Sequence, residues 1–165
     1  MTITVDITKQ SGDWDSAFKR TPDDQVHTIE KVCALVYSKF GGGDAEVSVV
    51  LADNDFVAGL NNRYRNKDKP TNVLSFPASD GFGIDGMVEQ LGDIIIALET
   101  VQCECAQQEK SFENHFVHLV LHGMLHLLGF DHIDPQEAEE MEALEIELLM
   151  QLGIEDPYMG TDVIG

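Results

Sequence analysis

Basic residues are scarce in this chain. It has 10 lysines and arginines against 30 aspartates and glutamates in 165 residues, which gives a formal net charge of −20. A charge of this size should keep the protein in solution and repel nucleic acid on average. No lysine or arginine follows Lys110, so the C-terminal part of the chain carries no fixed positive charge.

Cysteines and long apolar runs are also few. The three cysteines, Cys33, Cys103 and Cys105, are odd in number and two are nearly adjacent, which is a poor framework for disulfides. We expect small buried thiols in a reducing cytoplasm. No apolar run reaches about 18 residues, which excludes a membrane-spanning helix. Residues 1–6 alternate like a strand and lack the pattern of a signal peptide.

The chain contains no internal repeat and no low-complexity segment, so we expect a single domain over residues 1–165. The pattern predicts an α+β fold, with a small mixed β-sheet packed with about five helices. Caps at Thr21 and Asp134, each followed by proline, mark two helix starts. The expected strands are about 2–8, 46–51, 71–77 and 91–98; the helices about 21–40, 53–62, 99–109, 111–129 and 135–152; the loops about 63–70 and 79–87.

Three histidines stand at the spacing H-x-x-x-H-x-x-G-x-x-H, which is the ligand spacing of a metzincin zinc site. His122 and His126 lie one helical turn apart on the same face, so both imidazoles can reach one ion. Gly129 can end the helix in a left-handed conformation, and His132 then returns from another direction. Three histidine ligands leave the fourth position of a single Zn²⁺ open for water or substrate.

His118 provides a rival ligand set, because it lies one turn before His122. A straight helix rotates such a third ligand away from the ion, so His118/His122/His126 is the poorer triad. We interpret His118 and His115 as residues that pack the helix or hydrogen-bond a ligand. His27, in an unrelated helix, is expected to have no role in the site.

Gly123 occupies the position where a zinc peptidase carries its general-base glutamate, directly after the first histidine. The segment therefore resembles a zinc site without the peptidase base. Four of the ten basic residues, Arg63, Arg65, Lys67 and Lys69, fall within seven positions. This cluster fits either a local anion site or a solvated loop, and charge alone leaves both open.

Three segments together resemble the YbeY family of bacterial endoribonucleases: Arg65–Pro77, Leu91–Ile94 and His122–His132. The resemblance covers about residues 46–150. It implies that His122, His126 and His132 bind zinc and that Arg65 is the essential basic residue of the substrate cleft. It further implies a single-strand-specific, zinc-dependent endoribonuclease acting in ribosomal RNA maturation, at the 3′ end of the small-subunit RNA, and in ribosome quality control.

The chemistry of the residues agrees with this resemblance. Zinc can polarise a phosphoryl oxygen, and an arginine can stabilise the charge that develops on the phosphate. The nucleophile is either water or the RNA 2′-hydroxyl. Asp131 fits a contact that orients water or a ligand histidine, but also a plain turn residue. Asp93 and Ser75 fit residues that line the cleft, but also residues that end strands.

The expected partners are single-stranded or ribosomal RNA and a ribosomal protein or ribosome-associated factor, with no membrane. Two other functions stay open. One is a ribosome-assembly or binding factor with a structural zinc. The other is a zinc peptidase, against which Gly123 argues.

Overall fold

A four-stranded mixed sheet forms the centre of the protein. The computed structural model describes residues 3–18, 21–40, 43–65, 71–78, 88–130 and 134–157. The sheet order is β1-β2-β4-β3, with β1, β2 and β4 parallel and the edge strand β3 antiparallel to β4. The expected mixed sheet is confirmed. The strands are β1 (Ile3–Lys9), β2 (Ala45–Ala52), β3 (Val73–Pro77) and β4 (Glu89–Ala97).

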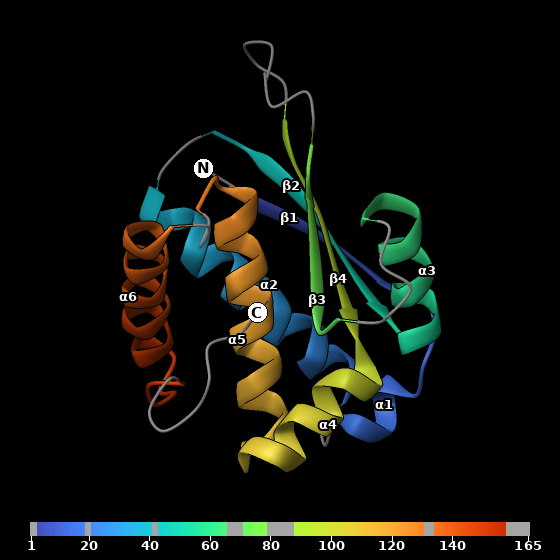
Figure 1. The fold of residues 1–165 in the computed structure, drawn as a ribbon. Coiled ribbons are helices and arrows are strands. Elements are labelled where there is room, and N and C mark those ends of the chain that lie inside the picture. The colour runs from blue at the N-terminus through green and yellow to red at the C-terminus, as the bar shows by residue number, and fades with distance from the viewer. Residues whose placement is uncertain are drawn as a thin grey trace.

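Helices cover the two faces of this sheet unequally. Figure 1 shows α2, α5 and α6 on one side and α3 on the other, with α1 and α4 at the lower end. The α+β class is therefore confirmed, and the described residues add one short helix, α1, to the five expected. The helices are α1 (Trp14–Ala17), α2 (Pro22–Phe40), α3 (Asn54–Arg65), α4 (Leu98–Gln108), α5 (Phe112–Leu127) and α6 (Pro135–Gln151).

Strand β4 is buried on both faces, as its continuous apolar run predicts. Ile94, Ile95 and Ile96 are 0, 4 and 0% exposed. Ile94 and Ile96 belong to the large core beneath α2 and α5, whereas Ile95 belongs to the smaller core beneath α3. A central strand with helices on both sides needs apolar residues in both directions.

The predicted starts of α2 and α6 and the predicted end of α5 are all present in the structure. The side chain of Thr21 accepts a hydrogen bond from Asp24 N, and that of Asp134 accepts one from Glu137 N. At the end of α5, Gly129 has a φ of +101°. Gly129 N and Phe130 N donate to the carbonyls of His126 and Leu125, which is the Schellman arrangement.

Two details differ from expectation. The sequence predicts a loop from Arg63 onward, but α3 continues to Arg65, so both arginines lie in its last helical turn. Cys103 is exposed, whereas Cys33 and Cys105 are buried as predicted. Burial raises the pKa of Cys33 to about 12 and that of Cys105 to about 11, which makes both thiols unreactive.

The loop expected at 79–87 lies outside the described residues. Within the described part of the chain, no helix is both long and apolar enough to cross a membrane.

Candidate metal centre

A row of four histidines runs along one side of α5. His115, His118, His122 and His126 follow one another at intervals of three, four and four residues, which keeps them on the same side of a helix. The first three are buried and His126 is half-buried. Buried polar rings need hydrogen-bond partners, and carboxylates of the neighbouring helices provide them.

Glu145 of α6 is the partner of the two middle histidines. Its Oε2 lies 2.8 Å from His118 Nε2 and its Oε1 lies 2.5 Å from His122 Nδ1. Burial raises the pKa of Glu145, but the hydrogen bonds from His118 and His122 outweigh burial and hold the pKa at about 2. The carboxylate is therefore ionised at neutral pH and can only accept, so both imidazoles donate to it.

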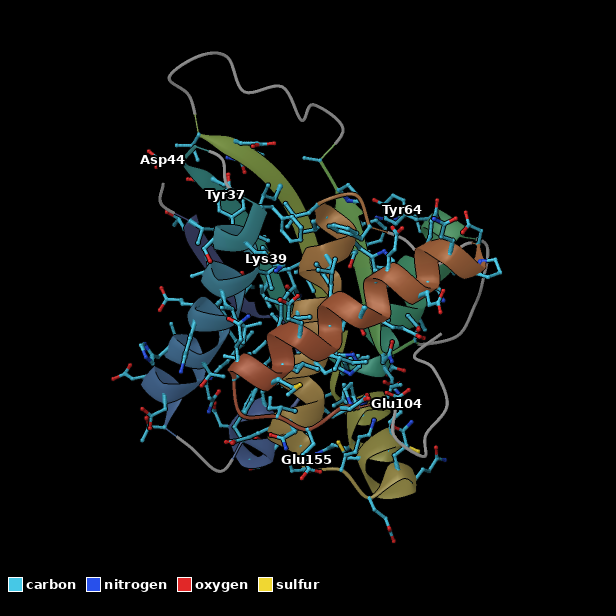
Figure 2. The ribbon with its side chains drawn as sticks, turned by 90° about the vertical axis from the view of Figure 1, so that its left-hand side faces the viewer. Tyr37, Lys39, Asp44, Tyr64, Glu104 and Glu155 are labelled. Atoms are coloured by element: carbon cyan, nitrogen blue, oxygen red, sulfur yellow. The ribbon has the colours of Figure 1, made fainter. Side chains whose placement is uncertain are left out.

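The protonation of His118 agrees with this assignment. Burial lowers the pKa of His118, against the opposing effect of Glu145. His118 is therefore a neutral imidazole that carries its proton on Nε2. The carboxylate of Glu145 is 0% exposed, and α6 packs directly on α5, as Figure 2 shows.

The other ring nitrogen of His122 faces His126. The two Nε2 atoms lie 3.0 Å apart, and the rings are nearly perpendicular. Because Nδ1–H of His122 is held by Glu145, the Nε2 of a neutral His122 carries a lone pair. Two nitrogens on one tetrahedral zinc would lie about 3.3 Å apart, given bonds of roughly 2.0–2.1 Å. The pair thus fits a shared ion after a shift of a few tenths of an ångström.

A second grouping includes Glu145 itself. The ligand atoms of His118, His122 and Glu145 all lie within 4.8 Å of one another, and all three residues are buried. The chain therefore has a possible metal site that includes His122 in either arrangement. In the structure, both Glu145 oxygens are at hydrogen-bond distance from ring nitrogens, which are the contacts of an acceptor.

His132 and Asp131 lie outside the described residues, as does the side chain of Arg65. Their roles remain predictions. The backbone shows where Arg65 lies, because this residue ends α3. The C-terminal ends of α3 and α5 lie at the same height, on either side of β3 (Figure 1). Figure 2 shows Tyr64, the neighbour of Arg65, at this same level.

Ser75 and Asp93 lie on opposite faces of the sheet. Ser75 pairs with Ile94, whose side chain meets α5, and directly paired residues point to the same face. Asp93 pairs with Phe76 and lines a cavity of about 570 Å³ on the other face. The structure thus brings Ser75, and not Asp93, to the side of the sheet that carries the histidines.

Gly123 is a packing residue. It is buried where α5 crosses β4, and a Cβ at this position would lie 2.9 Å from Ile94 Cγ2 and 3.2 Å from Ile94 Cδ1. Ile94 is fully buried and has little room to move. A glutamate at position 123 would therefore meet the sheet, which argues further against a peptidase of the metzincin type.

We expect Gly123→Ala to lower the free energy of unfolding by about 1–2 kcal/mol. Overpacking costs about 1–3 kcal/mol, and the better helix propensity of alanine offsets up to about 1 kcal/mol. Urea denaturation would measure the change. Gly59→Ala is the control, because Gly59 is an exposed residue of α3 with nothing within 4 Å of its Cβ position. Equal stability changes in the two variants would contradict the packing role.

Glu145 is the site residue that the motif did not predict. Its signal in the sequence is an acidic residue within the apolar stripe of α6, between Met141 and Leu148. The first histidine of the row, His115, is held by another carboxylate, with its Nε2 2.9 Å from Glu104 Oε1. His27 is exposed on α2, as expected of a residue outside the site.

Known proteins match the chain over most of its length. The family model described as Endoribonuclease YbeY matches residues 13–153. The chain belongs to the YbeY family. An Endoribonuclease YbeY of Parvibaculum lavamentivorans is 41% identical over 97% of this chain and 86% of its own length. That of Paramagnetospirillum magneticum is 54% identical over 70% of this chain and 73% of its own length.

The fold of this YbeY-family member also has a solved counterpart. A protein of Thermotoga maritima, determined in solution, matches 94% of the chain and 99% of its own length, with a TM-score of 0.54 and 22% identity. The family match begins at residue 13, well before residue 46, where the resemblance seen in the sequence begins. The N-terminal part, which includes α2, therefore belongs to the family domain as well.

Proposed function

We propose that this chain is a zinc-dependent endoribonuclease that cleaves single-stranded RNA in the cytoplasm. The observation that carries the proposal is the pair of imidazoles at 3.0 Å, with the tautomer of His122 fixed by Glu145. This pair of imidazoles occurs in a chain whose family and relatives are named Endoribonuclease YbeY. The biological substrate we propose is ribosomal RNA, at the 3′ end of the small-subunit RNA, in its maturation and in ribosome quality control.

The donor set suits zinc. His122 and His126 supply two neutral imidazole nitrogens, and we assign His132, which follows the turn at Gly129, as the third ligand. Imidazole is a favoured ligand of zinc, and also of copper, nickel and iron. When bound, zinc supplies a Lewis acid for a phosphoryl oxygen and lowers the pKa of water. Asp131, next to His132, is positioned in the sequence to orient that ligand.

Arg65 is assigned to the RNA phosphate. Its guanidinium can bind two phosphate oxygens at once and stays charged at any physiological pH. Charge that develops on the phosphate during cleavage is stabilised by such a group. The support is that α3 ends with Arg65 at the same end of the sheet as the C-terminal turns of α5 (Figure 1). Between these helix ends runs β3, whose Ser75 faces the α5 side and is assigned to the cleft.

The acidity of the chain has a consequence for RNA binding. Non-specific affinity for RNA grows with the number of basic contacts, and this chain has few basic residues. We therefore infer weak intrinsic binding to RNA. A ribosomal protein or another ribosome-associated factor would bring the enzyme to its substrate.

The function is tested with the purified zinc-loaded protein and two labelled RNAs, one single-stranded and one duplex. We expect internal cleavage of the single strand only, its loss on chelation and its return with added zinc. No cleavage of either RNA, together with a large fall in melting temperature on chelation, would instead favour an assembly factor with a structural zinc. Chelator-sensitive digestion of casein would favour a peptidase.

Arg65→Ala is expected to lower kcat for the single-stranded RNA by about 100-fold or more, because a preorganised donor to a developing anion contributes roughly 3–4 kcal/mol. Zinc content should stay unchanged. Arg65→Lys should recover only part of the rate, since lysine lacks the planar fork. The control is Arg63→Ala, which removes the same charge from the same helical turn, where Arg63 is exposed. An equal loss in both arginine variants would indicate general charge attraction instead.

A further inference from the structure

Glu145 is an unusual residue for the interior of this protein. Among the described residues it is the one carboxylate that is buried, at 0% exposure. Its neighbours on the inner side of α6 are apolar, with Met141, Leu148 and Leu149 all in the core. Removing an ionised carboxylate from water costs several kcal/mol, and a well-packed apolar residue often stabilises such a position more. Packing alone therefore does not account for a glutamate here.

The contacts of Glu145 point to the metal site. Its Oε1 accepts from Nδ1 of His122, which fixes both the ring orientation and the nitrogen that carries the proton. The opposite ring nitrogen, Nε2, is thereby directed to the point that His126 Nε2 also approaches, at 3.0 Å. Oε2 accepts from His118, so the carboxylate is held from two sides and cannot rotate away from His122 without losing a bond.

We propose that Glu145 is a positioning residue of the metal centre, which acts through His122, and that His118 is the residue that anchors Glu145. This inference rests on the proposed zinc site, but not on the identity of the substrate. A hydrogen bond from a ligand histidine to a carboxylate makes the other ring nitrogen a better and better-oriented metal ligand. The arrangement also ties α6 to the metal centre on α5, because Glu145 is part of α6.

The competing assignment makes Glu145 a direct ligand together with His118 and His122. If Glu145 is instead a positioning residue, a glutamine in its place acts only through the hydrogen bonds to the two rings. An amide presents one oxygen and one NH₂ group to the two ring N–H groups, so one contact becomes donor against donor. If that contact involves His122, the ring must change its tautomer and its proton moves to Nε2, the nitrogen that zinc requires.

The decisive measurement is zinc affinity, obtained by competition with a chromophoric chelator, for the wild type, Glu145→Gln and Glu104→Gln. We expect Glu145→Gln to bind zinc about 10- to 100-fold more weakly. Glu104→Gln is the matched control, because Glu104 holds His115 of the same helix in a similar hydrogen bond. Figure 2 shows Glu104 well below the level of Tyr64, on the part of the molecule that holds α4. Its zinc affinity should equal that of the wild type.

X-ray absorption at the zinc edge then separates the two assignments. The proposal expects the same histidine coordination in wild type and Glu145→Gln at saturating zinc, without a glutamate oxygen in either. A carboxylate ligand in the wild type that disappears in the variant would overturn it, as would an affinity within about twofold of wild type. Both readouts are independent of RNA cleavage, so a failure of the proposed nuclease function would not affect them.

A purely structural role for Glu145 is tested by the stability of the zinc-free proteins. Circular dichroism and the melting temperature show whether Glu145→Gln folds without metal. If it does not fold, Glu145→Asp decides the question, because it keeps the charge but withdraws the carboxylate from His122 by one methylene. A folded aspartate variant with wild-type zinc affinity would overturn the proposal.

Discussion

Replacement of His126 by alanine should abolish metal binding and RNA cleavage together. The zinc content is expected to fall from about one ion per chain to near zero, because two of three protein ligands do not hold a catalytic zinc firmly. Loss of the Lewis acid removes several kcal/mol of transition-state stabilisation, so cleavage should drop by about 1,000-fold or more. Elemental analysis and a single-stranded RNA assay measure the two effects.

His126 is the most suitable ligand for this experiment because it is half-buried, whereas His122 is 4% exposed and bonded to Glu145. The variant should therefore keep its fold. His27→Ala is the matched control, since His27 is an exposed histidine of α2. A His126→Ala protein that retains both zinc and activity would remove this residue from the site. Loss of zinc with full activity would remove zinc from the reaction.

The largest effect on stability is expected for Gly92→Ala. Gly92 has a φ of +133°, and a Cβ there would lie 2.2 Å from the carbonyl oxygen of Phe76. The obstacle is backbone, so it cannot move without disrupting the pairing of β3 with β4. Backbone strain and overpacking together should lower the free energy of unfolding by at least about 3 kcal/mol. Chemical denaturation would show this as a large fall in the midpoint.

Gly92 also follows the extra residue of a β-bulge. The pairing of β2 with β4 shifts after Glu46, so that Leu91 is the extra residue on β4.

Gly43→Ala is the control for Gly92→Ala, because nothing lies within 4 Å of the Cβ position of Gly43. The alanine at position 43 should change stability by less than about 0.5 kcal/mol. A Gly92→Ala protein as stable as that control would show that the edge strand can move away without cost.

The sequence was most informative where short-range geometry determines the structure. The caps at Thr21 and Asp134 and the helix end at Gly129 follow from local hydrogen bonding, and all three are found in the structure. The buried strand β4 follows from its continuous apolar run. The start of α2 and the end of α5 could be predicted because each depends on only a few neighbouring residues.

Predictions that depend on distant residues were less successful. The arginines at 63 and 65 look like part of a polar loop, but α3 continues through them because Leu60 and Phe56 pack this helix against the sheet. Cys103 is exposed because α4 turns it away from the core, whereas Cys105 lies on its inner side. Neither outcome is encoded in the local pattern.

The histidine spacing, the missing peptidase glutamate and the family resemblance can all be read from the order of the residues. The surroundings of these residues depend on how the helices and strands pack. This packing places Glu145 from α6 against His118 and His122, Ile94 against Gly123, and Ser75 and Asp93 on opposite faces of the sheet. The physical reason is that ligand spacing is a property of one helix. The proton positions on the imidazoles depend instead on a carboxylate 23 residues beyond His122, which only the packing of α6 on α5 brings into contact.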